Sequence, residues 1–192
     1  MRRRLELIDG HRIDLSLRTL KLFGSDPALR VRRGESLWAL RLSTGTVTLF
    51  LRHPADDGFA EAEAWGDGAS EAIERLPTLL GADDRRAGEF APSAEPLRTL
   101  QRRFRGLRLP RSGAVFDVLV RTVIEQKVSG KEAHRSFRRL VALHGESAPG
   151  PGELRLPPSP SRLAELDWAE LHPLGLEQRR ARILHGVARL AR

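Results

Sequence analysis

The sequence predicts an α+β fold, in which a small antiparallel sheet domain with helices comes first and an all-helical domain follows. Apolar residues alternate with polar or small ones over residues 36–52, as in half-buried strands. Beyond about residue 97 the apolar spacing changes to that of helices. Turn-forming and charged residues over 82–96 separate these regions and are typical of a linker. We therefore predict two domains, residues 1–90 and 91–192.

The first domain is predicted to be a sheet with helical cover. Residues 36–52 contain two alternating runs on either side of Thr44-Gly45, which suits a tight hairpin. Phe59 to Trp65 is a third candidate strand. A helix is expected over residues 68–80, and Pro77 should kink or end it early because proline has no amide hydrogen.

The second domain is predicted to be helical. Ser159-Pro160 places a capping residue before a proline, and Asp167 and Glu170 have capping-box spacing, so each pair marks a helix start. The Pro- and Gly-rich residues 145–158 are expected to form a loop without secondary structure. The longer helices are expected at residues 97–104, 114–126, 131–144 and 177–192.

The predicted helix over residues 114–126 has two contrasting faces. Asp117, Arg121 and Glu125 follow one another at four-residue spacing with alternating sign, which is typical of an exposed face. The face expected to be buried consists of Val115, Phe116, Leu119, Val123 and Ile124.

A tight corner separates this helix from the next one, within the stretch FDVLVRTVIEQKVSGKEAHRSF that begins at Phe116. Ser129 and Glu132 fit a capping box, in which the Ser hydroxyl accepts a backbone N–H and the Glu carboxylate returns to the Ser N–H. The break is therefore short and stiff. Its predicted tip consists of Gln126, Lys127 and Val128.

The composition favours a polyanionic partner. The chain has 192 residues, a formal net charge of +8 and a sequence pI near 11.2, which is unusual for an enzyme of small metabolites. It contains no cysteine, which excludes disulfides and thiol catalysis by these residues. No apolar run is long enough for a membrane span and no signal peptide is evident, so we expect a cytoplasmic, nucleoid-associated protein.

Basic residues are concentrated around the corner. Between Arg98 and Arg139 there are twelve Lys and Arg against three acidic residues, an excess of nine positive charges. Such a surface attracts phosphate backbones by counterion release, and the helix N-terminus near Ser129 adds oriented N–H groups. The alternative is an ordinary solvated face of an Arg-rich protein. On the helix after the corner, the outward side is predicted to carry Lys131, Arg135, Arg138 and Arg139.

Several motifs occur in a fixed order: RGLRLP at 105–110, the stretch around the corner, HGE at 144–146 and LPPSPSRLAELDWAELHPLGLEQRRARIL at 156–184. From about Phe104 to the end, this arrangement resembles the DNA-3-methyladenine glycosylase II (AlkA-like) family of the helix-hairpin-helix glycosylase superfamily. The first half resembles the sheet domain of that family only in pattern. The resemblance implies a base excision repair enzyme that binds and kinks duplex DNA, flips an alkylated purine into a pocket between the domains, and uses no metal or cofactor.

The resemblance also implies roles for the corner. In this family the residue after the Gln of the motif fills the gap left by the flipped base, and here it is Lys127, where a known member has an apolar residue. A Lys stem can fill the gap while its ammonium reaches a phosphate or base edge. Gln126 is expected to contact base edges or the opposite strand, and Val128 is either the wedge or packs beneath the corner. The predicted DNA-binding surface also includes Ser129, Lys131 and Arg135.

The resemblance assigns no catalytic residue to this chain. The catalytic Asp of the family follows a hairpin of the type Leu-Pro-Gly-Ile-Gly, and residues 1–192 contain neither feature. We therefore expect the helical domain to lack its C-terminal portion here. Glu125 is the carboxylate closest to the corner, and a pairing with Arg121 explains it.

No metal or cofactor site is predicted, because the six His residues lack ligand spacing and no phosphate-binding loop occurs. Among the Trp residues, Trp65 is the candidate wall of a base pocket, because it lies beside Gly66 at a strand end. Trp38 and Trp168 lie in apolar patterns that favour the core.

Two other interpretations stay open. The chain could be a non-catalytic DNA-binding or damage-sensing protein that keeps the fold and lacks the chemistry. It could instead be a basic regulator that places the helix around Arg135 to Arg139 in the major groove. The partner expected from the resemblance is double-stranded DNA with alkylated bases, bound by a monomer.

Overall fold

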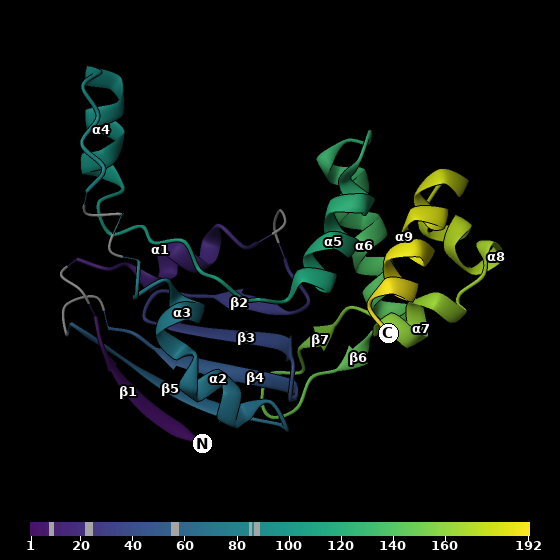
Figure 1. Ribbon diagram of the computed structural model, residues 1–192, viewed down its shortest axis with the longest axis horizontal. Helices are drawn as coiled ribbons and strands as arrows, with labels where there is room; N and C mark the ends of the chain where they lie inside the picture. Colours follow the sequence, from purple (N-terminus) through teal and green to yellow (C-terminus); the bar gives the residue numbers. More distant parts are fainter. Residues whose placement is uncertain (8–9, 22–24, 55–57, 85, 87–88) are drawn as a thin grey trace.

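The computed structural model describes residues 1–7, 10–21, 25–54, 58–84, 86 and 89–192, and it confirms the α+β class. An antiparallel sheet with short helices occupies one side, and a cluster of helices occupies the other (Figure 1).

The sheet has five strands in the order β1-β5-β4-β3-β2, each antiparallel to its neighbours. Its strands are β1 (Arg2–Glu6), β2 (Leu29–Val31), β3 (Glu35–Leu42), β4 (Gly45–Arg52) and β5 (Phe59–Trp65). The predicted hairpin and third strand are confirmed. Leu42 pairs with Gly45, so Ser43 and Thr44 form the turn, one residue earlier than expected.

Three short helices accompany the sheet: α1 (Ile13–Arg18), α2 (Ala69–Glu74) and α3 (Leu76–Leu80). The helix predicted over 68–80 divides at Arg75, and Pro77 lies in the first turn of α3, where its missing N–H costs nothing. Strand and helix side chains together form a core that includes Leu17, Leu49 and Leu79.

The helical cluster surrounds a second core. Its main members include the fully buried Ile124, Phe137 and Leu184. The predicted caps at Ser159 and Asp167 are confirmed, since each side chain accepts a hydrogen bond from a backbone N–H of its helix. The elements are α5 (Val115–Glu125), α6 (Gly130–His144), α7 (Pro160–Glu165), α8 (Trp168–Leu171), a 3-10 turn η2 (His172–Leu174) and α9 (Gln178–Leu190).

Residues 145–158 are not structureless, so that prediction is wrong. They contain β6 (Glu146–Ser147) and β7 (Arg155–Leu156), which pair with each other. The Arg155 N–H also donates to the Pro27 carbonyl at 3.0 Å, and Leu154 and Leu156 pack with Ala28 and Ala39 of the sheet side. This small hairpin therefore joins the two cores, a long-range contact that its local composition could not reveal.

Helix α4 (Glu95–Arg103) stands apart from both cores (Figure 1). The helix predicted at 97–104 exists, yet none of its residues is buried. Leu97 and Leu100 remain 46% and 48% exposed, and Phe104 after it is 38% exposed.

The predicted faces of α5 need correction. Val120, Val123 and Ile124 are buried, whereas Val115 and Leu119 are 67% and 41% exposed. The face of α5 that was expected to be solvated instead meets the sheet side, because Asp117 and Arg121 find charged partners there.

One further core prediction fails. Trp168 is 37% exposed, and its ring lies 4.7 Å from that of His172, whereas Trp38 is buried as expected. On α9, Ala181, Leu184 and Ala188 are buried, and Leu190 is 90% exposed.

The division into domains 1–90 and 91–192 remains a prediction. Part of its linker, residues 85, 87 and 88, lies outside the described residues. The two cores draw on residues from Ile13 to Leu80 and from Val120 to Ala188.

Candidate nucleic-acid interface

The corner, residues 126–129, projects as an exposed tip between α5 and α6. Gln126 leaves helical geometry with φ −63° and ψ 125°, which ends α5. Gln126, Lys127 and Ser129 are exposed, and Val128 is partly buried against the helical core. The structure therefore directs Gln126 and Lys127 outward and places Val128 beneath them. This is the second of the two positions that the sequence left open for Val128.

Lys127 has a left-handed backbone, with φ +57°. Residues with a Cβ atom adopt this conformation uncommonly, at a cost on the order of 1 kcal/mol. The conformation helps to reverse the chain between α5 and α6, and the Lys127 side chain is exposed there. A strained residue kept at an exposed tip motivates a functional hypothesis for that tip.

The predicted capping box at Ser129 is present. The Glu132 N–H donates to the Ser129 hydroxyl at 3.4 Å, and the Ser129 N–H donates to the Glu132 carboxylate at 3.0 Å. The Ser129 hydroxyl also donates to that carboxylate, at 2.8 Å, and these hydrogen bonds lower the pKa of Glu132. Because Ser129 is engaged with Glu132, the N–H groups of the first turn of α6 are better placed for a phosphate than the Ser side chain.

Arg180 of α9 supports the corner from below, a role that the sequence did not suggest. Its guanidinium is buried and donates to the carbonyls of Ile124 at 2.9 Å and Gly175 at 3.1 Å. Ile124 belongs to the last turn of α5, whose carbonyls lack helical partners and carry the negative end of the helix dipole. A cation at that position fixes where α5 ends. Arg180 lies in a run of arginines, and only its burial distinguishes it.

The positive charge around the corner is smaller than the sequence count suggested. Lys127, Lys131, Arg135 and Arg138 are exposed, and the last three share the outward side of α6, as predicted. Other counted arginines are engaged elsewhere: Arg98 and Arg102 with Glu95, Arg108 with backbone carbonyls, Arg111 with Asp83 and Arg121 with Asp26. The exposed charge next to the corner therefore forms a stripe along α6, and several of the other arginines counted between Arg98 and Arg139 are engaged in ion pairs.

A buried ion pair fastens α5 to the sheet side. Arg121 lies 2.8 Å from the Asp26 carboxylate, whose side chain is fully buried, and it also donates to the Leu20 carbonyl. The Arg121 guanidinium packs over the Phe137 ring at 4.7 Å. The sequence suggested that Arg121 pairs with Glu125, but Arg121 pairs with Asp26 instead. Through these contacts, the helix that carries the corner is held to the sheet.

Asp117 forms a second charged contact between the two sides. Its carboxylate lies 3.8 Å from the Arg41 guanidinium of β3, and Arg41 also binds Glu146 at 3.0 Å. Burial raises the pKa of Asp117 to about 6, although Arg41 and Arg121 partly oppose the increase. The carboxyl group is thus poorly solvated at the junction.

Comparison with solved structures identifies the architecture. A 3-methyladenine DNA-glycosylase from Archaeoglobus fulgidus superposes with a TM-score of 0.76 at 22% identity, over 97% of this chain and 66% of that one. MBOgg1 in complex with a low-affinity DNA ligand gives 0.70 at 12% identity, over 98% and 62% of the two chains. The chain has a DNA glycosylase fold.

An 8-oxoguanine glycosylase/lyase from Clostridium acetobutylicum, in complex with double-stranded DNA, agrees with this fold assignment. It superposes with a TM-score of 0.68 at 13% identity, over 99% of this chain and 64% of that one. The present chain therefore spans about two thirds of the length of these DNA glycosylases. No protein-family model and no curated protein sequence matches it.

Trp65, the candidate wall of a base pocket, is not brought to the corner of this glycosylase fold. It ends β5 and lies against Gly150, where an added Cβ atom would come within 2.7 Å of the Trp65 side chain. Its role in a base pocket remains a prediction.

Within the described part of the chain, no three His, Asp or Glu side chains gather closely enough to hold a metal ion. None of the described helices combines the length and apolar character that a bilayer crossing requires.

Proposed function

We propose that this chain belongs to the helix-hairpin-helix DNA glycosylase superfamily and binds damaged duplex DNA through the corner. The observation that carries this proposal is the geometry of residues 126–129. Gln126 and Lys127 project outward on a rigid turn at the end of a basic stripe, in a chain with a DNA glycosylase fold. A protein that extrudes a base must fill the gap, since lost stacking costs a few kcal/mol.

Lys127 is the proposed gap-filling residue. Its methylene stem occupies the space of the extruded base, and its ammonium reaches a phosphate or a base edge. Val128 supports it from within the helical core. Gln126 contacts base edges or the opposite strand, and Lys131 and Arg135 bind the backbone that passes α6. The capping box and Arg180 hold the corner in position before DNA arrives, which reduces the entropy lost on binding.

The proposed biological role is base excision repair of alkylated purines of the 3-methyladenine type. The reaction breaks an N-glycosidic bond and needs a carboxylate beside the developing oxocarbenium ion. Residues 1–192 contain no hairpin of the family type followed by Asp, and Glu125 is exposed on the outer side of α5. We therefore assign DNA binding and distortion to these residues, and to none of them the cleavage step. The cytoplasm, in association with the nucleoid, is the proposed location.

A binding experiment tests this function. Fluorescence anisotropy would compare a duplex that contains a central abasic-site analogue with an intact duplex of the same sequence. We expect tighter binding to the abasic duplex, and Lys127→Ala should reduce that preference several-fold while affecting the intact duplex less. Equal losses on both duplexes would show that Lys127 is an ordinary phosphate contact. A preference of the wild-type protein for intact DNA would instead favour a major-groove regulator.

A product assay addresses the chemistry. We expect no free 3-methyladenine when residues 1–192 are incubated with methylated duplex. Release of that base by the purified chain would overturn this expectation and assign catalysis to these residues.

A further inference from the structure

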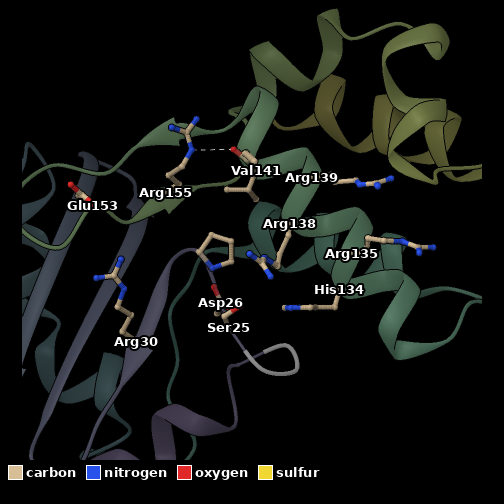
Figure 2. Close-up of a pocket in the computed structure, with 12 residues that line it drawn as sticks. Ser25, Asp26, Arg30, His134, Arg135, Arg138, Arg139, Val141, Glu153 and Arg155 are labelled. Atoms are coloured by element: carbon tan, nitrogen blue, oxygen red, sulfur yellow. Dashed lines mark hydrogen bonds between the residues drawn. The ribbon is translucent and has the colours of Figure 1, made fainter.

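A large open cleft lies at the far end of the basic stripe, between α6 and the sheet side. Its volume is about 580 Å³, within the range of ligand-binding sites. Figure 2 shows Arg30 of β2 on one wall, with the Asp26 loop beside it and α6 opposite. The cleft is thus built jointly by both sides of the molecule.

Five guanidinium groups line this basic cleft against two carboxylates, Asp26 and Glu153. Asp26 is already neutralised by Arg121. Arg155 is engaged with the carbonyls of Val141 and Gly145, at 3.2 Å and 2.8 Å. The remaining lining arginines are Arg30, Arg135, Arg138 and Arg139.

Among the described residues, the side chains of three of these arginines, Arg30, Arg135 and Arg138, form no ion pair or hydrogen bond. Arg139 donates to the Pro173 carbonyl at 3.4 Å. Arg138 and His134 point into the cleft toward Asp26, whereas Arg135 points away from it (Figure 2). The arginines outnumber the carboxylates of the cleft and repel one another, so an anion bound among them stabilises the arrangement, and the guanidinium fork suits a phosphate.

The basic cleft is continuous with the corner. Lys131, Arg135 and Arg138 follow at spacings of four and three residues, which places them on one side of α6. The eleven helical steps from Lys131 to Ala142, which lines the cleft, rise about 16 Å at 1.5 Å per step. That length corresponds to about five base pairs, at 3.4 Å for each step along a strand.

We propose that the basic cleft is a second phosphate-binding site, which holds the DNA backbone about five base pairs beyond the backbone contact at Lys131. This proposal rests on the function proposed above. It adds that the protein contacts the duplex mainly on one side of the nucleotide at the corner. The duplex axis follows α6, its near strand passes Lys131 and Arg135, and Arg138 and Arg30 bind its phosphates from opposite walls. A free nucleotide has the same phosphate chemistry and is the competing source of the anion.

The test uses the full chain and duplexes with an abasic-site analogue whose two arms differ in length. One arm is kept at about ten base pairs and the other is extended from about three to about ten, in both orientations, so that only one extension reaches the cleft. We expect this extension to raise the affinity of the wild-type protein about tenfold, and the opposite extension to have little effect.

The double variant Arg30→Ala/Arg138→Ala should lose the gain from extension. It should also reduce the slope of log affinity against log salt by about two, since each phosphate contact contributes about 0.9. Arg2→Ala is the matched control, because β1 lies at the opposite edge of the sheet from β2. We expect the control to behave like the wild type.

The outcomes separate this proposal from the first. The role of the cleft is overturned if the protein prefers the abasic duplex but its affinity does not depend on arm length. It is also overturned if the double variant retains the dependence on arm length. Both results leave the proposed role of the corner intact. Dependence on arm length without a preference for the abasic site supports the cleft and overturns the proposed function. The proposal would also be overturned if free nucleotide saturated the cleft of the wild-type protein without changing its affinity for duplex DNA.

Discussion

Helices α4 and α5 both have an amphipathic sequence pattern, and they occupy opposite environments. Helix α5 buries Val120, Val123 and Ile124, whereas α4 buries none of its residues (Figure 1). The difference comes from distant partners. Arg121 of α5 pairs with Asp26, and Asp117 pairs with Arg41, while Arg98 and Arg102 of α4 pair with Glu95 of the same helix. An apolar face shows that a helix can be covered, but long-range contacts decide whether it is.

Removal of the ion pair that anchors α5 should have the largest effect. Arg121→Ala leaves the fully buried Asp26 carboxylate without its partner, which should cost about 3–5 kcal/mol in unfolding free energy. Urea denaturation followed by circular dichroism measures this loss. The matched change on α4 is Arg98→Ala, which removes an exposed pair and should alter stability by less than about 0.5 kcal/mol. Similar losses in the two variants would remove the distinction between the helices.

Arg180→Ala should have the next largest effect, because it withdraws a charged donor from the Ile124 and Gly175 carbonyls. We expect a loss of about 2–3 kcal/mol, the range for charge-assisted hydrogen bonds in a buried site. Its exposed neighbour provides the control, since Arg179→Ala should be nearly neutral. If Arg180→Ala were equally neutral, the contact from α9 would not be what stabilises the C-terminal end of α5.

Asp117 tests whether the junction between α5 and the sheet carries an electrostatic cost. Its folded pKa of about 6 is above the ordinary value of 3.8, so the folded state binds the proton more tightly than the unfolded state. Stability should therefore fall as pH rises from about 4 to about 6 and stay lower above that range. Asp117→Asn should flatten this part of the profile and add about 1–2 kcal/mol at pH 7, with no gain below pH 4. An unchanged pH profile in the variant would contradict this account.

The smallest effect is expected on α4. Leu100→Ala removes a side chain that is already 48% exposed, so it should change stability by less than about 0.5 kcal/mol. The comparison variant, Ile124→Ala on α5, should cost about 2–5 kcal/mol because it leaves a cavity in a packed core. A substantial loss at Leu100 would show that α4 is covered in solution.

The features that could be predicted from the sequence are those set by neighbouring residues. The hairpin around Ser43, the capping boxes at Ser129 and Asp167, and the basic side of α6 follow from short-range patterns, and the structure contains them. The ion pair of Arg121, the contact of Asp117 with Arg41 and the support of Ile124 by Arg180 join residues that are between 56 and 95 positions apart, so periodicity could not show them.

The candidate site was predicted unevenly. Gln126 and Lys127 were placed at the tip correctly, because the capping box fixes where α6 begins. Ser129 was predicted as a DNA contact, but its own capping hydrogen bonds engage its hydroxyl. The basic cleft was not predicted, because Arg30 reaches it from the sheet side, more than a hundred residues from Arg138.

The left-handed backbone of Lys127 also constrains which residues can replace it during evolution. In this conformation a side chain branched at Cβ clashes with the backbone, whereas unbranched side chains, Asn and Gly are tolerated. Among natural or selected variants, branching at Cβ should therefore decide which residues occur at position 127, and polarity should matter less. Met, Gln or Leu would be accessible at the tip, and Val, Ile and Thr would be rare even though Val follows at the next position.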